Sequence, residues 1–476
     1  MDPILIILIG TAVVLFCIIV LRMHAVISLL LAALVTAFLT SPDLIYNFAL
    51  NSGMSEQKAL EFSKVSIGKR LGEAFGNTSG KIGILIALAS VIGTSLMRSG
   101  GAERIVRSLL KLFGKKNSSI ALLFSSFTLA IPVFFDTVFY LMIPVIKSMG
   151  IKNPKKFSLY LMVVIAGGVM AHSLIPPTPG PLFVAETMNI DLGTMMIGGI
   201  IIGLITVLCG YGYAVWANLK WDLPMRSTPD ISIDELKQIS EKDNKDLPKL
   251  WLSLLPVLLP ILLITGNTFS KMFSEGHDNL SDLQTNVVSV FSVLGDPNIA
   301  LFISALIAMY LMWSRIVDID TFKKYMYESL TSAGMIILIT SAGGVFGQML
   351  QQTGVGIRIQ ELSANYQMAI LPMAFFITAA VRTAQGSATI AMVTTIGIMS
   401  GVASTGLAFH PVYLALVIGC GSKIFAWMND SAFWIITKMS GMEEKETIRH
   451  FSILLMVMAF GGLFSIMILS KLFPFI

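Results

Sequence analysis

Ten stretches of mostly apolar residues, each about as long as a bilayer is thick, run through this chain of 476 residues. A transmembrane helix needs about 20 apolar residues, because each residue adds about 1.5 Å and the hydrocarbon core measures about 30 Å. Hydrophobic residues make up 55% of the chain and charged residues only 13%. The pattern therefore predicts an all-α polytopic membrane protein.

The predicted spans differ in regularity. They cover residues 4–21, 25–41, 82–97, 157–190, 193–219, 250–266, 298–314, 331–350, 409–438 and 450–471. We interpret 4–21 as a first span and not as a signal peptide, because Asp2 precedes it and no Lys or Arg does. A loop over 42–80 and a polar linker over 222–249 separate groups of spans.

The span 157–190 is interrupted by four prolines and a glycine within residues 172–181. Proline lacks an N–H and clashes with the preceding helical turn. Freed backbone groups persist at membrane depth only where protein buries them or they line a wet cavity. Such breaks indicate a transporter's binding site; the alternative is a surface loop. Residues 427–431 interrupt the span 409–438 as well.

Two further segments, 119–149 and 368–400, are too long for one span and too short for two. One helix of thirty residues would measure about 45 Å, whereas each half would reach only about 20 Å. Each also has a polar or proline-containing centre, at residues 130–137 and 382–387. A re-entrant hairpin, which enters the bilayer and returns on the same side, satisfies both constraints.

Basic residues set the predicted orientation. They flank the first hairpin on both sides: Arg98, Arg104, Arg107, Lys111, Lys115, Lys116, Lys147, Lys152, Lys155 and Lys156. By the positive-inside rule both flanks are cytoplasmic. The flanks of the second hairpin are nearly uncharged, which suits the external face. Both termini are then external and the 222–249 linker cytoplasmic, although the external loop 42–80 also carries basic residues.

Parts of the chain repeat at a spacing of 254 residues. The matching pairs are Gly93 and Gly347, Gly100 and Gly354, and Ile105 and Ile359. A hairpin and a broken span follow in each half, and five spans per half would insert the second half inverted. We therefore predict an inverted repeat, the plan of many secondary transporters, with halves at 1–221 and 250–476 joined by a cytoplasmic linker at 222–249.

Arg382 is the strongest single candidate for binding a solute. An arginine at membrane depth costs about 2.5–3.5 kcal/mol unless it is paired or hydrated, and its guanidinium can hold a carboxylate through two hydrogen bonds. The adjacent Gln385, Gly386 and Ser387 precede a helix N-terminus, which attracts anions. The alternative is a structural ion pair of Arg382 with Asp430 or Asp136.

The two hairpin turns and the two helix breaks form four interruptions. Candidate proton carriers and partners for solute hydroxyls lie at or beside them. Asp136, Asp430 and His172 can exchange protons, although both acids can also act as helix N-caps and His172 can bond freed carbonyls. Lys423 either pairs with an acid or lines the cavity. Candidate partners for solute hydroxyls are Ser173, Thr178, Asn429 and Ser431.

Other chemistries lack support in the sequence. Cys17, Cys209 and Cys420 are far apart and give no metal spacing. Neither a zinc-protease motif nor a nucleophile–base pair stands out, so an intramembrane enzyme is not expected. The basic residues lie in loops and form no stripe for nucleic acid. We expect no cofactor and no metal.

The residues at these interruptions resemble those of a known family. Residues 172–181 (HSLIPPTPGP), 382–389 (RTAQGSAT) and 429–434 (NDSAFW) are similar to the gluconate permease family of gluconate:proton symporters. The resemblance covers essentially the whole chain. It implies a homodimer with a scaffold and an elevator-like transport domain formed by the hairpins and broken helices. It also implies a cargo of gluconate, a related sugar acid, glycerate or D-serine.

We therefore expect an inner-membrane symporter that imports gluconate or a related small hydroxycarboxylate with protons. Arg382 would hold the carboxylate, and one of the titratable residues would carry the proton. Two alternatives stay open. Sodium could replace the proton, because carbonyls of unwound helices bind Na⁺. An anion channel is a rival of another class, but it needs a continuous pore.

Overall fold

The computed structural model describes residues 1–114, 117–226, 247–275, 281–316, 318–354, 369–403 and 407–475, and every regular element in them is helical. The first half contains α1 (Pro3–Leu15), η1 (Phe16–Val20), α2 (Ala25–Leu39), α3 (Pro42–Asn51), α4 (Glu56–Ser63), α5 (Ile67–Arg98), α6 (Gly101–Phe113), α7 (Ser118–Leu129), α8 (Phe135–Lys152), η2 (Pro154–Lys156), α9 (Phe157–Leu174), α10 (Pro179–Thr187) and α11 (Leu192–Lys220). Most of the linker predicted at 222–249 lies outside the described residues.

The second half begins after that linker. It contains α13 (Leu250–Glu275), α14 (Asp282–Leu294), α15 (Pro297–Trp313), α16 (Ile319–Gln351), α18 (Ile370–Gln385), α19 (Ala388–Ala403), α20 (Pro411–Gly421), α21 (Ser431–Ser440), α22 (Glu444–Thr447), η5 (Ile448–Ser452) and α23 (Ile453–Leu472). Six helices of the described chain are long and apolar enough to cross a membrane, or up to eight if each of two bent pairs counts as one span. The protein is thus a multi-pass, all-helical membrane protein.

The breaks predicted from proline and polar residues are confirmed. α9 ends at Leu174 before α10 begins at Pro179, and α20 ends at Gly421 before α21 begins at Ser431. The segments 119–149 and 368–400 each form two helices around a short turn, α7 with α8 and α18 with α19. That these pairs enter and leave the bilayer on one side stays a prediction.

The prediction of a loop over 42–80 is wrong. The segment forms α3, α4 and the first half of α5, which is 32 residues long. Gly68, Gly72, Gly76 and Gly80 all lie in this half of α5, although glycine is a poor helix former. Local propensity is a weak guide here, since α5 packs along α16, and tertiary contacts supply most of the stability of a helix in a protein.

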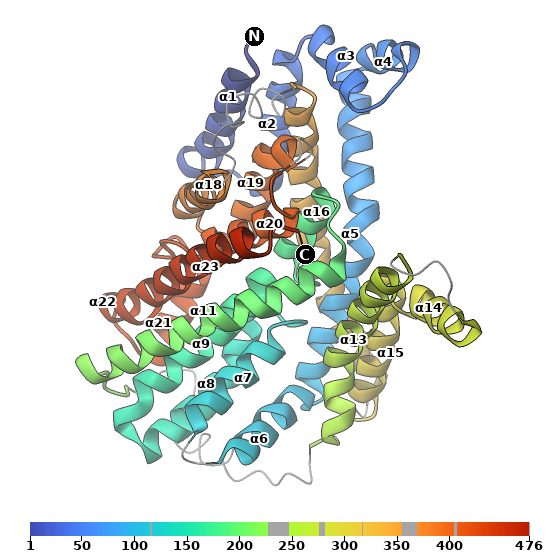
Figure 1. The fold of residues 1–476 in the computed structure, drawn as a ribbon. Coiled ribbons are helices and arrows are strands. Elements are labelled where there is room, and N and C mark those ends of the chain that lie inside the picture. Colours follow the sequence, from blue (N-terminus) through green and yellow to red (C-terminus); the bar gives the residue numbers. More distant parts are fainter. Residues whose placement is uncertain are drawn as a thin grey trace.

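Helices α5 and α16 pack antiparallel through the middle of the molecule (Figure 1). Arg70, near the start of α5, donates to Gln352 just after α16. Near the other end of α5, the Ser90 hydroxyl donates to the Ser329 carbonyl oxygen at 2.9 Å, at the opposite end of α16. The two helices thus form a wall that separates α1, α2, α18 and α19 from α13 and α15.

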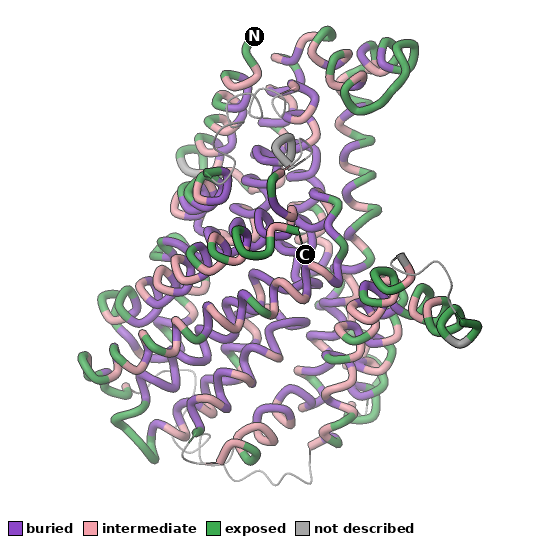
Figure 2. Tube along the Cα trace, viewed as in Figure 1, coloured by how far each residue is buried: buried purple, intermediate pink, exposed green. Residues whose placement is uncertain are grey.

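Helix α9 lies at the centre of the buried region (Figure 2). Every residue of α9 except His172 is buried, and α7, α8 and α11 pack on it. A helix that is apolar all round belongs inside a protein or in lipid, and here protein covers it. The one partly open residue, His172, faces the cavity described below.

Close approaches at glycines hold this region together. A Cβ added at Gly167 of α9 would come far inside van der Waals distance of the Leu123 carbonyl oxygen and the Ser126 hydroxyl of α7. Added at Gly199 of α11, it would collide with the Leu174 carbonyl group at the end of α9. Small residues allow helix backbones in membranes to approach closely, and packing then replaces the hydrophobic effect as the driving force.

We expect Gly167→Ala to destabilise the protein by about 1–3 kcal/mol, since the added methyl group overpacks the α7–α9 contact. Gly212→Ala is the matched control, because Gly212 lies in the apolar helix α11 with open space around its Cα. The control should leave stability unchanged or raise it by up to about 1 kcal/mol. Thermal unfolding of the detergent-solubilised protein measures both, and equal midpoints would contradict the close contact.

Candidate functional site

The turn between α7 and α8 forms the first part of the site. α7 ends at Leu129 and α8 begins at Phe135, with Pro132 between them. Asp136 lies in the first turn of α8, where the helix dipole favours a negative charge. The ring of Phe134 makes an edge contact with the imidazole of His172, with centroids 5.7 Å apart. The first hairpin therefore brings a carboxylate to the break between α9 and α10.

Side-chain hydroxyl groups form hydrogen bonds to backbone carbonyls at the break between α9 and α10. The Ser173 hydroxyl donates to the Val169 carbonyl oxygen at 3.0 Å, and the Thr178 hydroxyl donates to the Ile175 carbonyl oxygen at 2.6 Å. Both side chains are buried. The Thr178 bond satisfies a carbonyl that Pro179, four residues later, cannot serve because it lacks an N–H. The Ser173 bond goes to a carbonyl within α9. Ser173 and Thr178 therefore shape the break.

The turn between α18 and α19 depends on Gly386. Its φ of +79° is in the left-handed region that glycine adopts without strain. A Cβ there would also collide with the Asn429 carbonyl group, so the close approach of the second break requires glycine too. The amide of Gly386 donates to the Arg382 carbonyl oxygen at 2.9 Å and ends α18.

The second break is attached to the end of α18. The Asn429 amide donates to the Thr383 carbonyl oxygen at 2.7 Å, and the Trp427 indole N–H donates to the same oxygen at 3.2 Å. Asp430 begins α21 as its N-cap and accepts a hydrogen bond from the Ala432 N–H at 2.9 Å. The last carbonyls of a helix lack helical donors, and here the second break supplies them.

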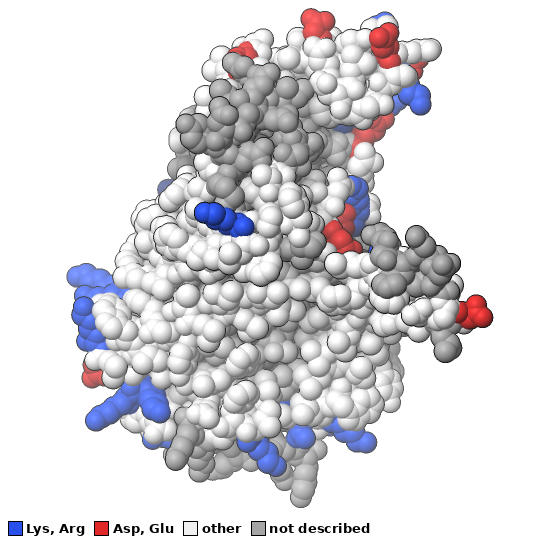
Figure 3. All heavy atoms as spheres, viewed as in Figure 1, with Lys and Arg blue, Asp and Glu red and all other residues white. Residues whose placement is uncertain are grey.

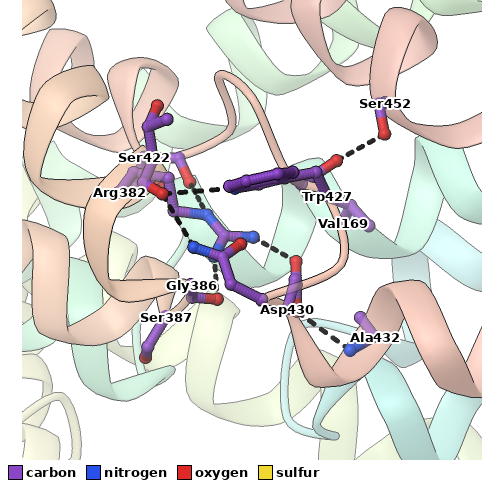
Figure 4. Close-up of polar contacts among 12 residues, drawn as sticks. Val169, Arg382, Gly386, Ser387, Ser422, Trp427, Asp430, Ala432 and Ser452 are labelled. Atoms are coloured by element: carbon purple, nitrogen blue, oxygen red, sulfur yellow. Dashed lines mark hydrogen bonds and ion pairs between the residues drawn. The ribbon is translucent and has the colours of Figure 1, made fainter. Parts of the chain in front are cut away.

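Arg382 joins the α18–α19 turn to the second break (Figure 4). Its Nε donates to the Ser422 carbonyl oxygen at 3.0 Å, one terminal nitrogen donates to the Gly386 carbonyl oxygen, and the other pairs with the Asp430 carboxylate. The side chain is 2% exposed. The structure thus contains the ion pair with Asp430 that was the alternative for Arg382. Three of the five guanidinium N–H groups are used this way, and that Arg382 holds a solute carboxylate stays a prediction.

A cavity of about 320 Å³, called the central cavity from here on, lies where the two hairpins and the two breaks meet. Its size falls at the lower end for small-molecule sites, which measure about 300–1,000 Å³. Nine of the eleven predicted site residues line it: Asp136, His172, Arg382, Gln385, Gly386, Ser387, Asn429, Asp430 and Ser431. Ser173 and Thr178 do not, and Thr178 instead lines a small neighbouring pocket.

Lys423 and Thr389 also line the central cavity. For Lys423 this is one of the two roles that its place within the span 409–438 predicted. The residue is 5% exposed, and its side-chain amine forms no hydrogen bond or ion pair with any residue that the structure describes. Thr389 left no comparable signal, because threonines are common in apolar helices.

Several polar atoms around the central cavity are left without partners among the described residues. They include Nε2 and Oε1 of Gln385 and Nδ1 of His172. A buried polar group without a hydrogen bond costs about 1–3 kcal/mol in proteins. Together with Lys423, these atoms form a buried set of free donors and acceptors. The arrangement can hold a small anion that also carries hydroxyl groups.

Comparison with known proteins places the chain in a family. The family model described as GntP family permease matches residues 2–472. The chain belongs to the GntP family of permeases. It is therefore a membrane transport protein and not an enzyme.

Three relatives cover nearly all of this permease. It is 34% identical to an uncharacterized permease of Haemophilus influenzae, over 93% of this chain and 86% of that protein. It is 30% identical to a gluconate permease of Pseudomonas aeruginosa, over 92% and 95%. It is 29% identical to a high-affinity gluconate transporter of Escherichia coli, over 98% and 99%.

A solved structure shares the fold. The YdaH transporter of Alcanivorax borkumensis, described as having an unusual topology, aligns with a TM-score of 0.52 at 12% identity. The alignment covers 84% of this permease and 88% of that chain. At this identity the likeness concerns the fold alone.

We expect Asp430→Asn to destabilise this permease by about 3–5 kcal/mol, because a buried arginine loses its counter-charge while asparagine still caps α21. Asp296→Asn is the matched control, since Asp296 is half-buried and caps α15 by accepting from the backbone amides of Asn298 and Ile299. The control should change stability by less than about 0.5 kcal/mol. Midpoints from tryptophan fluorescence measure both. Similar small shifts would show that the charge of Asp430 is not needed.

Proposed function

We propose that this permease is a proton-coupled symporter that imports gluconate or a related small hydroxycarboxylate across the inner membrane. The observation that carries the proposal is the central cavity, which is lined by Lys423, whose amine forms no hydrogen bond or ion pair with the described residues, and by unpaired polar atoms of Gln385 and His172. Relatives named as gluconate permeases support the choice of solute.

The solute would bind through both of its chemical groups. Its carboxylate would pair with Lys423 and with the N–H groups of Arg382 that the protein leaves free. Its hydroxyls would meet Gln385, Ser387, Asn429 and Ser431, which line the same cavity. Asn429 and Ser431 are exposed and would lie at the mouth. Glycerate or D-serine would fill fewer of these positions than gluconate, which supports the longer solute.

Charge balance supports coupling to a proton. In their ordinary ionisation states Arg382 and Lys423 are cations and Asp136 and Asp430 are anions, so the empty site is neutral when His172 is neutral. A bound carboxylate adds one negative charge, and one proton restores neutrality. Moving a net charge through the bilayer is expensive. Asp136 is the proposed carrier, since Asp430 is held by Arg382; His172 is the second candidate.

Two further cavities support an inverted repeat. The Arg98 cavity, of about 420 Å³, and the Gln351 cavity, of about 580 Å³, lie along α5 and α16. Five residues of α5 line the first cavity, and the five residues 254 positions later, at the end of α16 and just after it, line the second. The pairs are Ser90 and Gly344, Gly93 and Gly347, Thr94 and Gln348, Met97 and Gln351, and Arg98 and Gln352.

The packing of α5 on α16 agrees with a two-fold axis between them. A Cβ at Gly83 would touch Ile337, which is its own counterpart at the 254-residue spacing. Gly100 and Gly354, another pair at this spacing, both have left-handed φ values, +76° and +74°. Ile359 lies outside the described residues. These contacts support repeat halves at 1–221 and 250–476 with the linker 222–249 between them.

We propose that the hairpins and broken helices move as a unit along the α5–α16 wall. Phe134 lines both the central cavity and the Arg98 cavity. The Arg98 cavity would therefore give access to the central cavity from one side of the membrane. The Gln351 cavity, its counterpart in the other half, would give access from the other. A homodimer, in which the scaffold parts of two copies meet, remains part of the proposal through the family resemblance.

The distribution of charge supports the proposed orientation (Figure 3). On the face shown, lysines and arginines gather at the bottom and lower left, over the end of the molecule with α6, α21 and α22, whereas acids mark the top near α3 and α4. By the positive-inside rule the bottom faces the cytoplasm. The Arg98 cavity would then open inward and the Gln351 cavity outward.

We expect Lys423→Met to raise the KM for gluconate about tenfold to a hundredfold, the value of a hydrogen bond to a charged group. Lys438→Met is the matched control, because Lys438 is exposed in the last turn of α21 and lies outside the central cavity. Uptake of labelled gluconate into proteoliposomes measures both. An unchanged KM in Lys423→Met would remove Lys423 from the proposed site.

We expect an inward proton gradient to drive accumulation of gluconate in proteoliposomes, and Asp136→Asn to abolish this accumulation. Counterflow exchange of gluconate should persist in the variant, because exchange moves no net proton. Replacing sodium by choline at fixed pH should change nothing, since sodium dependence would favour the alternative coupling ion. Accumulation that persists in Asp136→Asn would contradict its role, and absence of counterflow in the native protein would favour a channel.

A further inference from the structure

The Gln351 cavity differs in chemistry from its counterpart in the other half. Where the Arg98 cavity has Thr94, Met97 and Arg98, the Gln351 cavity has three glutamines. A repeated backbone places these positions, but it does not require glutamine at any of them. The three carboxamides are therefore a property of this one side of the protein.

Two of the glutamines have free side chains. Gln352 accepts a hydrogen bond from Arg70. The side chains of Gln348 and Gln351 form no hydrogen bond with any described residue, and neither does the side chain of Asn77 on the facing helix α5. Carboxamides offer two donors and one acceptor oxygen each. They are suited to neighbouring hydroxyl groups of a polyol.

The cavity also contains a cation. Lys81 of α5 lines it and forms no hydrogen bond or ion pair with the residues that the structure describes. Glu186 of α10 lines it as well and interacts electrostatically with Lys81. Phe48 of α3 and Phe62 of α4 cover one side with aromatic rings. Concave sites with apolar walls and a few placed polar groups are typical of small-molecule sites.

We propose that the Gln351 cavity is a second solute-binding site, which takes a polyhydroxy monocarboxylate before it reaches the central cavity. Lys81 holds the carboxylate, and Gln348 and Gln351 hold the hydroxyls, with Asn77 beside them on α5. The inference rests on the solute class of the proposed function. It adds a separate binding event on the side of the molecule with α3 and α4.

Cysteine protection tests the site without any need for transport. Asn77→Cys is introduced into the full chain, purified in nanodiscs and labelled with a maleimide reagent, with the native chain measuring the background from Cys209. D-gluconate at ten times its Kd should slow the labelling about tenfold. The same protection should persist when Lys423→Met disables the central cavity.

Substitutions in the cavity decide the result. Gln348→Leu with Gln351→Leu should abolish the protection, whereas the matched control Gln57→Leu, an exposed glutamine of α4 outside the cavity, should leave it intact. Absence of protection in any background would overturn the site. Protection that disappears with Lys423→Met would also overturn it, because the cavity would then only follow events at the central site.

The outcome is separate from that of the uptake assay. If gluconate protects Asn77→Cys but is not accumulated in proteoliposomes, the second site is supported and the proposed transport fails. If gluconate is accumulated and Asn77→Cys is not protected, the proposed function stands and the second site fails.

Discussion

The structure depends on satisfying the backbone groups that four helix interruptions release inside a membrane protein. Water is absent from the hydrocarbon core, so each open carbonyl or amide needs a protein partner. The second break supplies Asn429 and Trp427 to the end of α18, and Arg382 bonds the Ser422 and Gly386 carbonyls. The ion pair of Arg382 with Asp430 balances the charge within the same group of contacts. The interruptions thus stabilise one another, and the space between them is the central cavity.

The same constraint separates residues that build the site from residues left free to bind. Backbone carbonyls accept hydrogen bonds from the side chains of Arg382, Ser173 and Thr178. Lys423 and Gln385 line the cavity without such partners among the described residues. A polar residue at membrane depth is therefore not a ligand-binding residue by its chemistry alone. Its partners decide, and for Arg382 they lie 4 to 48 positions away along the chain.

The antiparallel wall of α5 and α16 connects the fold with the proposed transport. Its two helices carry residues 254 positions apart into cavities at opposite ends of the wall. In the proposed transport cycle, these two cavities would give access from the two sides of the membrane. The side chains differ between the cavities, since Thr94 and Gln348 are paired at this spacing and offer different hydrogen-bonding groups. An inverted repeat would therefore present different chemistry to the two sides.

The amino-acid sequence by itself determined the class of fold, the proline breaks and most members of the central cavity, because apolar length and helix-breaking residues act locally. It also contains three residue pairs at a spacing of 254, on which the predicted repeat rests. It misled over 42–80, where we predicted a loop and packing on α16 holds the first half of α5 in a helix. Only the tertiary structure decided that Arg382 pairs with Asp430, that Lys423 has no such partner among the described residues and that Ser173 does not line the cavity. Pairing depends on which chain segments meet in space, and no local pattern of residues contains that information.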